Sequence, residues 1–408
     1  MSAALIRLRP SDLSDNVAAS TTVHIPMVGN GIVAGASGLG EAGANTTFRS
    51  GGVLSNLYAK VYANTRGTSS VITRKDATSD GAQALSITAS TTGEFQDVTN
   101  TDTVTAAEQW CFKLVTGAGG TTFLITVLSV VFTATTNTVS KIGCCNPNGR
   151  TLSASTTRYH TFGGDCLTTT IAEAAAQIKM YSAGTLKNLM VYCSTAPTNA
   201  VTIRTRVAGA NGALSVSVNG TGVFEDTSNT DTLSAGSLAN FQIVTGATTQ
   251  AVISQISVEL TTTDSKMMLS VSEDFGLAQT AGLTRYTAVA GYMGANSATE
   301  TDWRANVNVA CTASKLHCSI TANTIVSDST LRLRVNGANG NQVVTITALT
   351  TGIFEDTSNS DVLAATDEVA YEIVTPSTAT SITLRYIAMM LTASSSTFTP
   401  RLTLLGVG

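Results

Sequence analysis

A ten-residue phrase occurs three times along this chain of 408 residues. The copies begin at Gly93, Gly222 and Gly352. In each copy the third residue is Phe, the fifth and tenth are Asp, and the eighth is Asn. The copies are therefore 129 and then 130 residues apart. A period of this length is that of a small domain, whereas solenoid repeats have periods of roughly 20–50 residues. The phrase predicts three tandem copies of one domain.

The composition of the chain favours β-structure within these domains. Charged residues make up 12% of the sequence and hydrophobic residues 43%. Much of the remainder is Thr, Ser, Asn and Gly. Thr suits the pleated surface of a strand, and Gly and Asn suit turns. Disorder is disfavoured because disordered chains are poor in apolar residues and usually have a high net charge.

About eight alternating apolar and polar segments occur in each unit, with turn residues roughly every 8–12 residues. The strongest turn signals are Asp80-Gly81, Asn211-Gly212 and Asn339-Gly340, each between two alternating segments. Such pairs favour hairpin turns because the central residues need a positive φ. We therefore predict an all-β fold of three tandem antiparallel β-sandwich domains that are jelly-roll-like.

One segment has a helical composition, although no unit contains a convincing amphipathic helix. Residues Ile171–Met180 are rich in residues that favour a helix. The corresponding segment of the third unit, Trp303–Val309, alternates like a strand. Because equivalent positions should share a structure, we predict a strand at both.

The predicted domains span residues 1–138, 139–264 and 265–392, and residues 393–408 are predicted to contain an extra strand. A segment like the opening strand Ala4–Arg9 begins each unit and recurs near the C-terminus. Unpaired strand edges are normally protected, so this surplus strand needs a partner. It could close the third unit, pair with the N-terminal strand to link the chain ends, or add to a neighbouring chain.

The Asp and Asn residues of the phrase have two interpretations. Their side chains can form an Asx-type turn that hydrogen-bonds the backbone and reverses the chain, with the Phe as a core anchor. Alternatively, their oxygens can bind Ca²⁺, although the further carboxylate and the Gly spacing of a recognised calcium loop are missing. The turn is the preferred interpretation. The alternative metal ligands are Asp97, Asn100, Asp102, Asp226, Asn229, Asp231, Asp356, Asn359 and Asp361.

No group of residues supports catalysis or a cofactor. His24, His160 and His317 lack the spacing of a zinc site, and no Gly-x-Ser-x-Gly elbow lies between a strand and a helix. The seven cysteines are odd in number and include an adjacent pair, so we predict buried free thiols rather than a disulfide framework. We expect a protein that is not an enzyme and that has no cofactor.

The charge pattern argues against two classes of partner. The formal net charge is −4 and no Lys/Arg cluster occurs, which disfavours nucleic acid. No apolar run approaches the ~18 residues of a membrane span, and the N-terminus has no secretory signal, so synthesis in a cytoplasm is expected. Single basic residues recur on the hairpin strands at Lys75, Arg206 and Arg334. A solvated face or cross-strand pairing explains them, and an inter-subunit salt bridge is the alternative.

The phrase and its flanks resemble known virion modules. Each copy reads Gly-x-Phe-x-Asp, then a Thr/Asn/Asp turn, then an aromatic strand that ends in Val-Thr. This pattern resembles the Thr-, Gly- and Asn-rich β-modules of tailed-phage virion proteins. Strand number and unit length are similar to jelly rolls of the C1q and tumour-necrosis-factor type, which assemble as trimers. That second resemblance implies a covalent pseudo-trimer.

The resemblance implies a virion structural protein, in particular a capsid decoration (cement) protein that bridges capsid subunits. Its expected location is the virion, its expected partner is the major capsid protein, and self-association is possible. The alternative is a tail or fibre module that binds a host-surface glycan by stacking on Tyr58, Tyr159, Tyr286 or Trp303. An enzyme that acts on surface polysaccharide has no support among the residues.

Overall fold

The computed structural model describes residues 2–8, 16–29, 40–135, 139–164, 172–247, 251–264, 266–293, 296–307, 310–376, 380–393 and 399–400. These residues form mainly antiparallel sheets with three short helical turns, α1 (Gly40–Ala44), α2 (Glu173–Ala176) and the 3-10 helix η1 (Glu300–Asp302). The predicted all-β sandwich class is confirmed. Among the described residues, no helix is long and apolar enough to cross a membrane.

The first group of strands, called unit 1, forms two sheets. One has the order β29-β1-β9-β4-β7 and the other β2-β8-β5-β6, with β3 also paired to β8. The strands are β1 (Ser2–Leu8), β2 (Thr22–Pro26), β3 (Thr46–Thr47), β4 (Gly52–Asn64), β5 (Ser69–Lys75), β6 (Ser79–Ile87), β7 (Gly93–Val104), β8 (Gln109–Val115) and β9 (Phe123–Ala134).

Unit 2 repeats this arrangement in the sheets β10-β18-β13-β16 and β11-β17-β14-β15, with β12 paired to β17. Its strands are β10 (Val139–Thr151), β11 (Thr157–His160), β12 (Ile178–Lys179), β13 (Gly184–Thr195), β14 (Val201–Val207), β15 (Ala210–Val218), β16 (Gly222–Leu233), β17 (Leu238–Val244) and β18 (Val252–Thr262).

Unit 3 has the sheets β21-β19-β28-β23-β26 and β20-β27-β24-β25, with β22 paired to β27. Its strands are β19 (Lys266–Thr280), β20 (Thr284–Thr287), β21 (Gly291–Tyr292), β22 (Ala305–Asn306), β23 (Cys311–Asn323), β24 (Ser329–Val335), β25 (Ala338–Ile346), β26 (Gly352–Leu363), β27 (Glu368–Val374) and β28 (Ser381–Ala393); β29 (Thr399–Pro400) follows.

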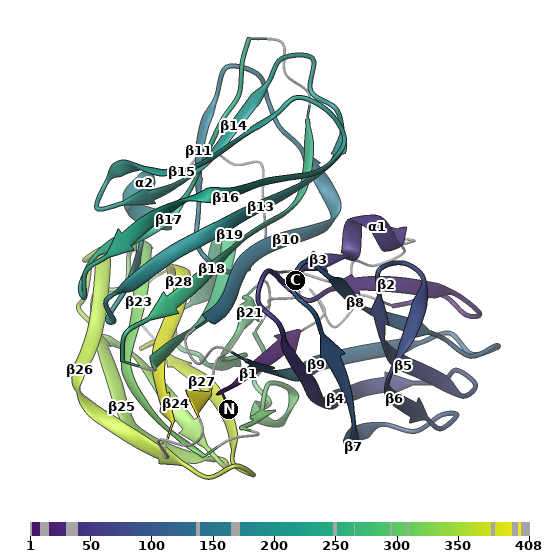
Figure 1. The fold of residues 1–408 in the computed structure, drawn as a ribbon. Coiled ribbons are helices and arrows are strands. Elements are labelled where there is room, and N and C mark those ends of the chain that lie inside the picture. Colours follow the sequence, from purple (N-terminus) through teal and green to yellow (C-terminus); the bar gives the residue numbers. More distant parts are fainter. Residues whose placement is uncertain are drawn as a thin grey trace.

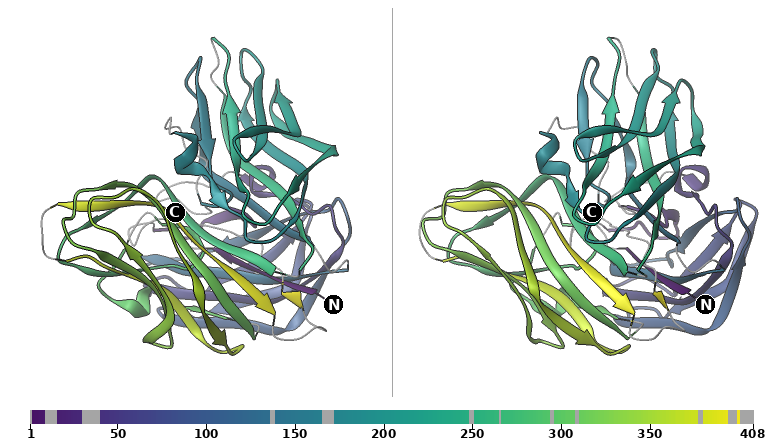
Figure 2. Two further views of the ribbon diagram at one scale, coloured as in Figure 1. Left: turned by 90° about the vertical axis from the view of Figure 1, so that its left-hand side faces the viewer. Right: turned by 60° about the vertical axis from the view of Figure 1, so that its left-hand side comes forward.

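The strand order is the same in all three units. The first sheet of each pairs its opening strand with the last strand, and the second sheet has the interleaved order of a two-sheet jelly roll. The three sandwiches lie around a common centre, with unit 2 at the top, unit 1 at the right and unit 3 at the lower left of Figure 1. The two turned views in Figure 2 show the same grouping.

One strand in the first sheet of each unit is covered on both faces. In unit 1, residues 123–132 of β9 are all buried, and so are residues 253–260 of β18 and 384–391 of β28. A strand with only one covered face would alternate, as β6 does. We call these three sheets the inner sheets, because they pack against their own sandwich on one face and against neighbouring units on the other.

The buried hydrophobic residues gather into two large clusters. Unit 1 has its own cluster, whereas those of units 2 and 3 are continuous and also include Tyr58, Val127 and Val131 of unit 1. Strand grouping follows the threefold sequence repeat, but burial does not divide the molecule into three separate cores. The domain limits 1–138, 139–264 and 265–392 therefore stay a prediction.

The surplus C-terminal strand finds a partner at the other end of the chain. Strand β29 pairs in parallel with β1, with Ser2 opposite Thr399 and Ala3 opposite Pro400. Of the three fates considered for the segment 393–408, the described part therefore pairs with the N-terminal strand. The expected strand at residues 401–405 lies outside the described residues.

The hairpins exist, but their turns are not where the sequence pattern places them. In these hairpins, positive φ angles occur at Asp76 (48°) and Ala77 (55°) in unit 1 and at Asn336 (51°) and Gly337 (81°) in unit 3. Asp80-Gly81, Asn211-Gly212 and Asn339-Gly340 instead lie inside β6, β15 and β25. The predicted turn position is therefore wrong, because each turn precedes the predicted pair.

The strand predicted over Ile171–Met180 is wrong in its central part. Residues Glu173–Ala176 form α2, and only Ile178–Lys179 are extended. The equivalent region of unit 3 has η1 followed by the two-residue strand β22. Helix propensity is the better guide here, because residues 173–176 pair with no strand of either sheet.

Candidate functional site

The repeated phrase lies within a continuous strand and does not reverse the chain. In unit 1 it forms most of β7, which pairs with β4. The register shifts between the pairs Ser55–Thr101 and Leu57–Asp97, so residues 98–100 bulge out opposite Asn56 alone. Equivalent shifts occur in units 2 and 3. The expectation that the phrase is a turn between strands is therefore wrong, although the role expected for its Asp side chains is correct.

The first Asp of the phrase holds the bulge in shape. Asp97 Oδ1 accepts hydrogen bonds from the backbone N–H of Thr99 (3.2 Å) and of Asn100 (3.1 Å). Its Oδ2 accepts from the Asn100 side-chain amide (2.9 Å) and from the backbone N–H of Ala84 on β6 (3.0 Å). Burial raises the pKa of Asp97, but these hydrogen bonds outweigh it and lower the pKa to about 2.

The second Asp of the phrase also contacts β6, the strand of the opposite sheet that Asp97 contacts. Asp102 Oδ2 accepts from the Thr73 hydroxyl (2.6 Å) and from the backbone N–H of Gln83 (3.4 Å), and Oδ1 accepts from the N–H of Ala82. Strands β6 and β7 are the edges of the two sheets of unit 1. The two carboxylates thus bind edge N–H groups that have no neighbouring strand, and we call this arrangement the carboxylate clasp.

The carboxylate clasp is repeated in units 2 and 3. Asp226 accepts from the N–H of Ser215 (3.0 Å) and Asp356 from that of Val343 (2.9 Å), each on the edge strand of the other sheet. In both units the Asn of the phrase also donates to the first Asp. The second Asp of each unit repeats the backbone contacts of Asp102, with N–H donors at Ala213, Leu214, Asn341 and Gln342.

The Gly of each Asp-Gly or Asn-Gly pair makes room for the carboxylate clasp. A Cβ on Gly212 would lie 2.4 Å from Asp231 Oδ2 and 2.5 Å from Thr205 Oγ1. On Gly81 and Gly340 a Cβ would lie 2.7 Å and 2.9 Å from the equivalent Asp carboxylate oxygens. The backbone φ at these glycines is not positive, so close approach, not turn geometry, explains them.

We expect Gly212→Ala to destabilise unit 2 by about 2 kcal/mol, because added volume at a tightly packed position forces strain or displaces the carboxylate. Gly220 in the same unit is the matched control, since a Cβ there would meet only Phe224 Cζ at 3.7 Å. Calorimetric melting of the two variants compares them directly. Equal melting temperatures would contradict the close-approach explanation.

The nine residues considered as calcium ligands all lie in the three carboxylate clasps. Their Asp oxygens already accept hydrogen bonds from N–H and O–H donors, so a cation at these oxygens would have to displace donors that hold the two sheets together. Within the described ranges, no group of three or more His, Cys, Asp or Glu residues is arranged to hold a metal ion. The hydrogen-bond donors around these oxygens fit the backbone-binding interpretation, and calcium binding stays an untested alternative.

The Phe of each phrase lies at the margin of the core. Phe95, Phe224 and Phe354 are partly buried and pack against the hydrophobic clusters. They are therefore anchors of the inner-sheet edge rather than fully buried core residues.

A repeated Arg joins each hairpin to the short helical turn of its own unit. Arg206 Nε and Nη2 bind Glu173 of α2 at 2.7 and 2.8 Å, and Arg334 Nη2 binds Glu300 of η1 at 3.0 Å. The equivalent in unit 1 is Arg74, which binds Glu41 of α1, and not Lys75. Arg206 and Arg334 also donate to Asn211 and Asn339, which lie opposite them on the neighbouring strand, so the expected cross-strand pairing is correct for these two residues.

The histidines lie apart from one another. His24 is 3.6 Å from Glu41, and His160 is buried in β11. His317 is fully buried between the rings of Tyr181 and Tyr386, and burial lowers its pKa to about 4.

The cysteines are buried wherever the structure describes them. Six are buried free thiols, as predicted: Cys111, Cys144, Cys145, Cys193, Cys311 and Cys318. The seventh, Cys166, lies outside the described residues.

The aromatic residues considered for glycan stacking are mostly covered. Tyr58 and Trp303 are buried, with 2% and 1% exposure. Tyr159 and Tyr286 are half-buried, and the guanidinium groups of Arg206 and Arg334 lie over their rings, at 5.9 and 6.0 Å. These four side chains do not form a common exposed platform.

Contacts between units form a second repeated pattern, and we call each contact zone a seam. At the seam between units 1 and 2, Arg49 Nε binds Glu225 Oε1 (3.1 Å), and the Arg49 backbone N–H donates to Glu259 Oε1 (3.0 Å). Gln255 Nε2 donates to the Thr46 hydroxyl at 2.9 Å. Arg49 follows the short strand β3, whereas Glu225 belongs to the phrase of unit 2.

The seam between units 2 and 3 uses the equivalent elements. Lys179 Nζ, at the end of the short strand β12, lies 2.7 Å from Glu355 Oε2 in the phrase of unit 3. The Tyr181 hydroxyl donates to the same carboxylate, and its ring packs edge-on against His317 at 5.1 Å.

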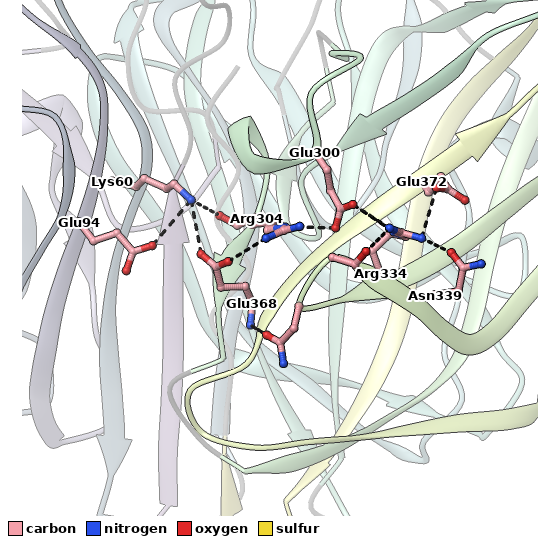
Figure 3. Close-up of polar contacts among 10 residues, drawn as sticks. Lys60, Glu94, Glu300, Arg304, Arg334, Asn339, Glu368 and Glu372 are labelled. Carbon is pink, nitrogen blue, oxygen red and sulfur yellow. Dashed lines mark hydrogen bonds and ion pairs between the residues drawn. The ribbon is translucent and has the colours of Figure 1, made fainter.

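The seam between units 3 and 1 completes the set (Figure 3). Asn306 Nδ2, at the end of β22, donates to Glu94 Oε2 in the phrase of unit 1 at 3.0 Å. Lys60 Nζ lies 3.6 Å from Glu368 and 3.7 Å from Glu94, and it donates to the Arg304 carbonyl at 3.4 Å. Unit 3 therefore contacts unit 1 as unit 1 contacts unit 2.

The seams are cyclic because each unit uses its short-strand end to contact the phrase of the next. Three equivalent head-to-tail contacts that return to the first unit define a closed ring with pseudo-threefold symmetry. Two glycines mark close approaches between neighbouring units. A Cβ on Gly29 would lie 1.9 Å from the backbone N of Cys145 in unit 2, and one on Gly164 would lie 2.2 Å from Ser272 Oγ in unit 3.

The titratable side chains of the repeated motifs join sheets, hairpins and units. The repeated sequence pattern reveals the phrase but not the seams, because Arg49, Lys179 and Asn306 are different residue types at corresponding places.

No protein-family model matches the chain, and no curated protein sequence matches it significantly.

Proposed function

We propose that this protein is a structural component of a phage or phage-like particle, specifically a capsid decoration (cement) protein. The supporting observation is the closed cycle of three equivalent seams, which gives a single chain the pseudo-threefold symmetry of a trimer. A shell built of identical subunits presents threefold and quasi-threefold positions. A pseudo-trimer placed there can touch three neighbouring subunits at once.

Rigidity is a second argument for this function. Simultaneous contacts strengthen binding only when the three contacting surfaces are held at the spacing of their targets. The carboxylate clasp closes each sandwich, and each seam fixes one sandwich against the next, so such surfaces would be preorganised. A protein whose polar groups serve assembly needs no catalytic site to perform this task.

The test is to locate the chain on purified particles. We expect a fixed number of copies per particle, and we expect shells stripped of this protein to rebind it at threefold or quasi-threefold positions and to resist heating better. Recovery of the chain only as a free protein would contradict the proposal. Location on the tail, together with binding on a glycan array, would favour the fibre-module alternative.

A further inference from the structure

The seam between units 3 and 1 is the one seam whose two units do not follow each other in the chain. Units 1 and 2 are consecutive in sequence, and so are units 2 and 3, so the polypeptide itself joins each of these pairs. Units 3 and 1 meet instead through side chains and through the pairing of β29 with β1. A covalent closure of the ring must therefore come from side chains at this seam.

An amine, a carboxylate and an amide meet at this seam. The Glu94 carboxylate lies between the other two groups, with Oε1 3.7 Å from Lys60 Nζ and Oε2 accepting a hydrogen bond from Asn306 Nδ2 at 3.0 Å. Lys60 and Glu94 face each other across β4 and β7 of unit 1, whereas Asn306 belongs to β22 of unit 3. The Lys60 amine also donates to the Arg304 carbonyl at 3.4 Å, so it lies beside the segment that carries Asn306 (Figure 3).

The other two seams do not contain this combination at the equivalent positions. The strand registers give those positions as Tyr192, Val223 and Thr47 at the seam between units 1 and 2, and as Ser319, Ile353 and Lys179 at the seam between units 2 and 3. Amine, carboxylate and amide therefore occur together at the one seam that the polypeptide does not bridge.

These three groups are the components of an amide exchange. Lys60 Nζ attacks Cγ of Asn306, a new C–N bond forms, and the bond from Cγ to Nδ2 breaks. Nζ gives up two of its three hydrogens, and the departing nitrogen takes both and leaves as an ammonium ion, so no further reactant is needed. The Glu94 carboxylate contacts both nitrogens and can carry these protons, first as general base and then as general acid. Holding the reacting groups together makes the step effectively unimolecular.

We propose that Lys60 and Asn306 form an amide bond between their side chains, with Glu94 as the catalytic residue, and that this bond closes the ring covalently. The contacts described above are those of the unreacted groups. Lys60 is 17% exposed and Glu94 34%, so the ammonium ion has a path to solvent. Ion pairs at this exposure are weakened by salt, whereas an amide bond would hold unit 1 against unit 3 at any salt concentration. This inference does not depend on the proposed role in a virion.

The test is mass spectrometry of the purified natural protein after incubation at neutral pH until its mass is constant. A linked chain is lighter than its sequence by one ammonia molecule. Trypsin should release a branched peptide in which residues 50–66, uncut after Lys60, are joined to residues 305–315 through Asn306. The peptide decides the result, because an Asn-Gly pair can also lose ammonia by closing a ring. Absence of the branched peptide, with full cleavage after Lys60, would overturn the inference.

Three variants assign the roles of the side chains. Lys60→Arg keeps the positive charge but cannot form the bond, and Glu94→Gln keeps the size of the side chain but removes the carboxylate. Both should lack the branched peptide and should migrate more slowly than the natural chain in a denaturing gel, because an internal link makes an unfolded chain more compact.

Glu368→Gln is the matched control. Glu368 is as close to Lys60 Nζ as Glu94 is, at 3.6 Å, but the Asn306 amide donates to Glu94. This variant should keep the branched peptide. Equal loss of the peptide in Glu368→Gln and Glu94→Gln would contradict the catalytic role of Glu94. The existence of the bond is decided on the natural protein, so a variant that fails to fold does not affect that result.

Discussion

Replacing Asp97 with Ala is expected to lower the free energy of unfolding of unit 1 by about 3 kcal/mol, the scale of losing hydrogen bonds to a charged acceptor and leaving their donors unsatisfied. The substitution removes the acceptor of the backbone N–H groups of Ala84, Thr99 and Asn100. It therefore frees both the bulge and one contact between the two sheets. Urea denaturation followed by Trp110 fluorescence, in a Trp303→Phe background, reports on unit 1.

The neighbouring substitution Gln96→Ala is the matched control, because Gln96 is exposed on the same strand. It should change the free energy of unfolding by no more than about 0.5 kcal/mol. If Asp97→Ala were as mild as Gln96→Ala, the carboxylate clasp would not be a stabilising element.

Acid should erase the difference between the natural protein and Asp97→Ala. The pKa of Asp97 is about 2 in the folded protein and about 4 in an unfolded chain. A lowered folded-state pKa contributes stability above the unfolded value, and that stability is lost as pH falls toward the folded value. The two denaturation curves should therefore converge between about pH 4 and about pH 2. A difference that stayed constant over this range would show that the charge of Asp97 is not involved.

Replacing Glu259 with Gln is expected to cost about 3 kcal/mol, because it removes the negative charge that favours the ammonium form of the buried Lys141. Glu259 is only 3% exposed and accepts hydrogen bonds from the Arg49 N–H and from Asn188 Nδ2 (2.7 Å). Lys141 stands directly opposite it on β10 and is itself buried. Burial lowers the pKa of Lys141, and the charge of Glu259 opposes that shift.

A double-mutant cycle measures this coupling. Combining Glu259→Gln with Lys141→Met should cost less than the sum of the single substitutions, by roughly 1–3 kcal/mol, since removing both charges leaves none unpaired. Glu368→Gln at the seam between units 3 and 1 is the control, because Glu368 is 28% exposed and should cost no more than about 1 kcal/mol. Strictly additive effects at Glu259 and Lys141 would contradict this electrostatic coupling.

Local sequence signals predicted what kind of interaction a residue makes better than they predicted which residue it contacts. The pattern around Asp97 correctly indicated a side chain that hydrogen-bonds nearby backbone, as it does at Thr99 and Asn100. Its contact with Ala84 could not be seen, because that residue belongs to the opposite sheet. The same limit applies to Arg206, whose partner Glu173 lies 33 residues earlier on α2.

The wrong turn position predicted from the Asp-Gly and Asn-Gly pairs has a related cause. A Gly after Asn or Asp is favoured both where φ must be positive and where another group must approach closely, and the sequence does not distinguish the two. At Gly212 the structure shows that close approach is the reason for the glycine, because Asp231 from another strand lies against it. The actual turn of that hairpin lies at Ala208 and Gly209, with φ of 50° and 76°.

The sequence by itself determined the threefold repeat, the all-β class and the existence of each hairpin, because these depend on periodicity and on local backbone preferences. Only the tertiary structure decided that the phrase joins two sheets, that three seams close into a ring, and that β29 returns to β1. Those features depend on pairs of residues that are far apart in the chain. At the seams, the paired residues also differ in type from one unit to the next. Such pairs leave no repeated local pattern, so they become visible only when the strands are placed in space.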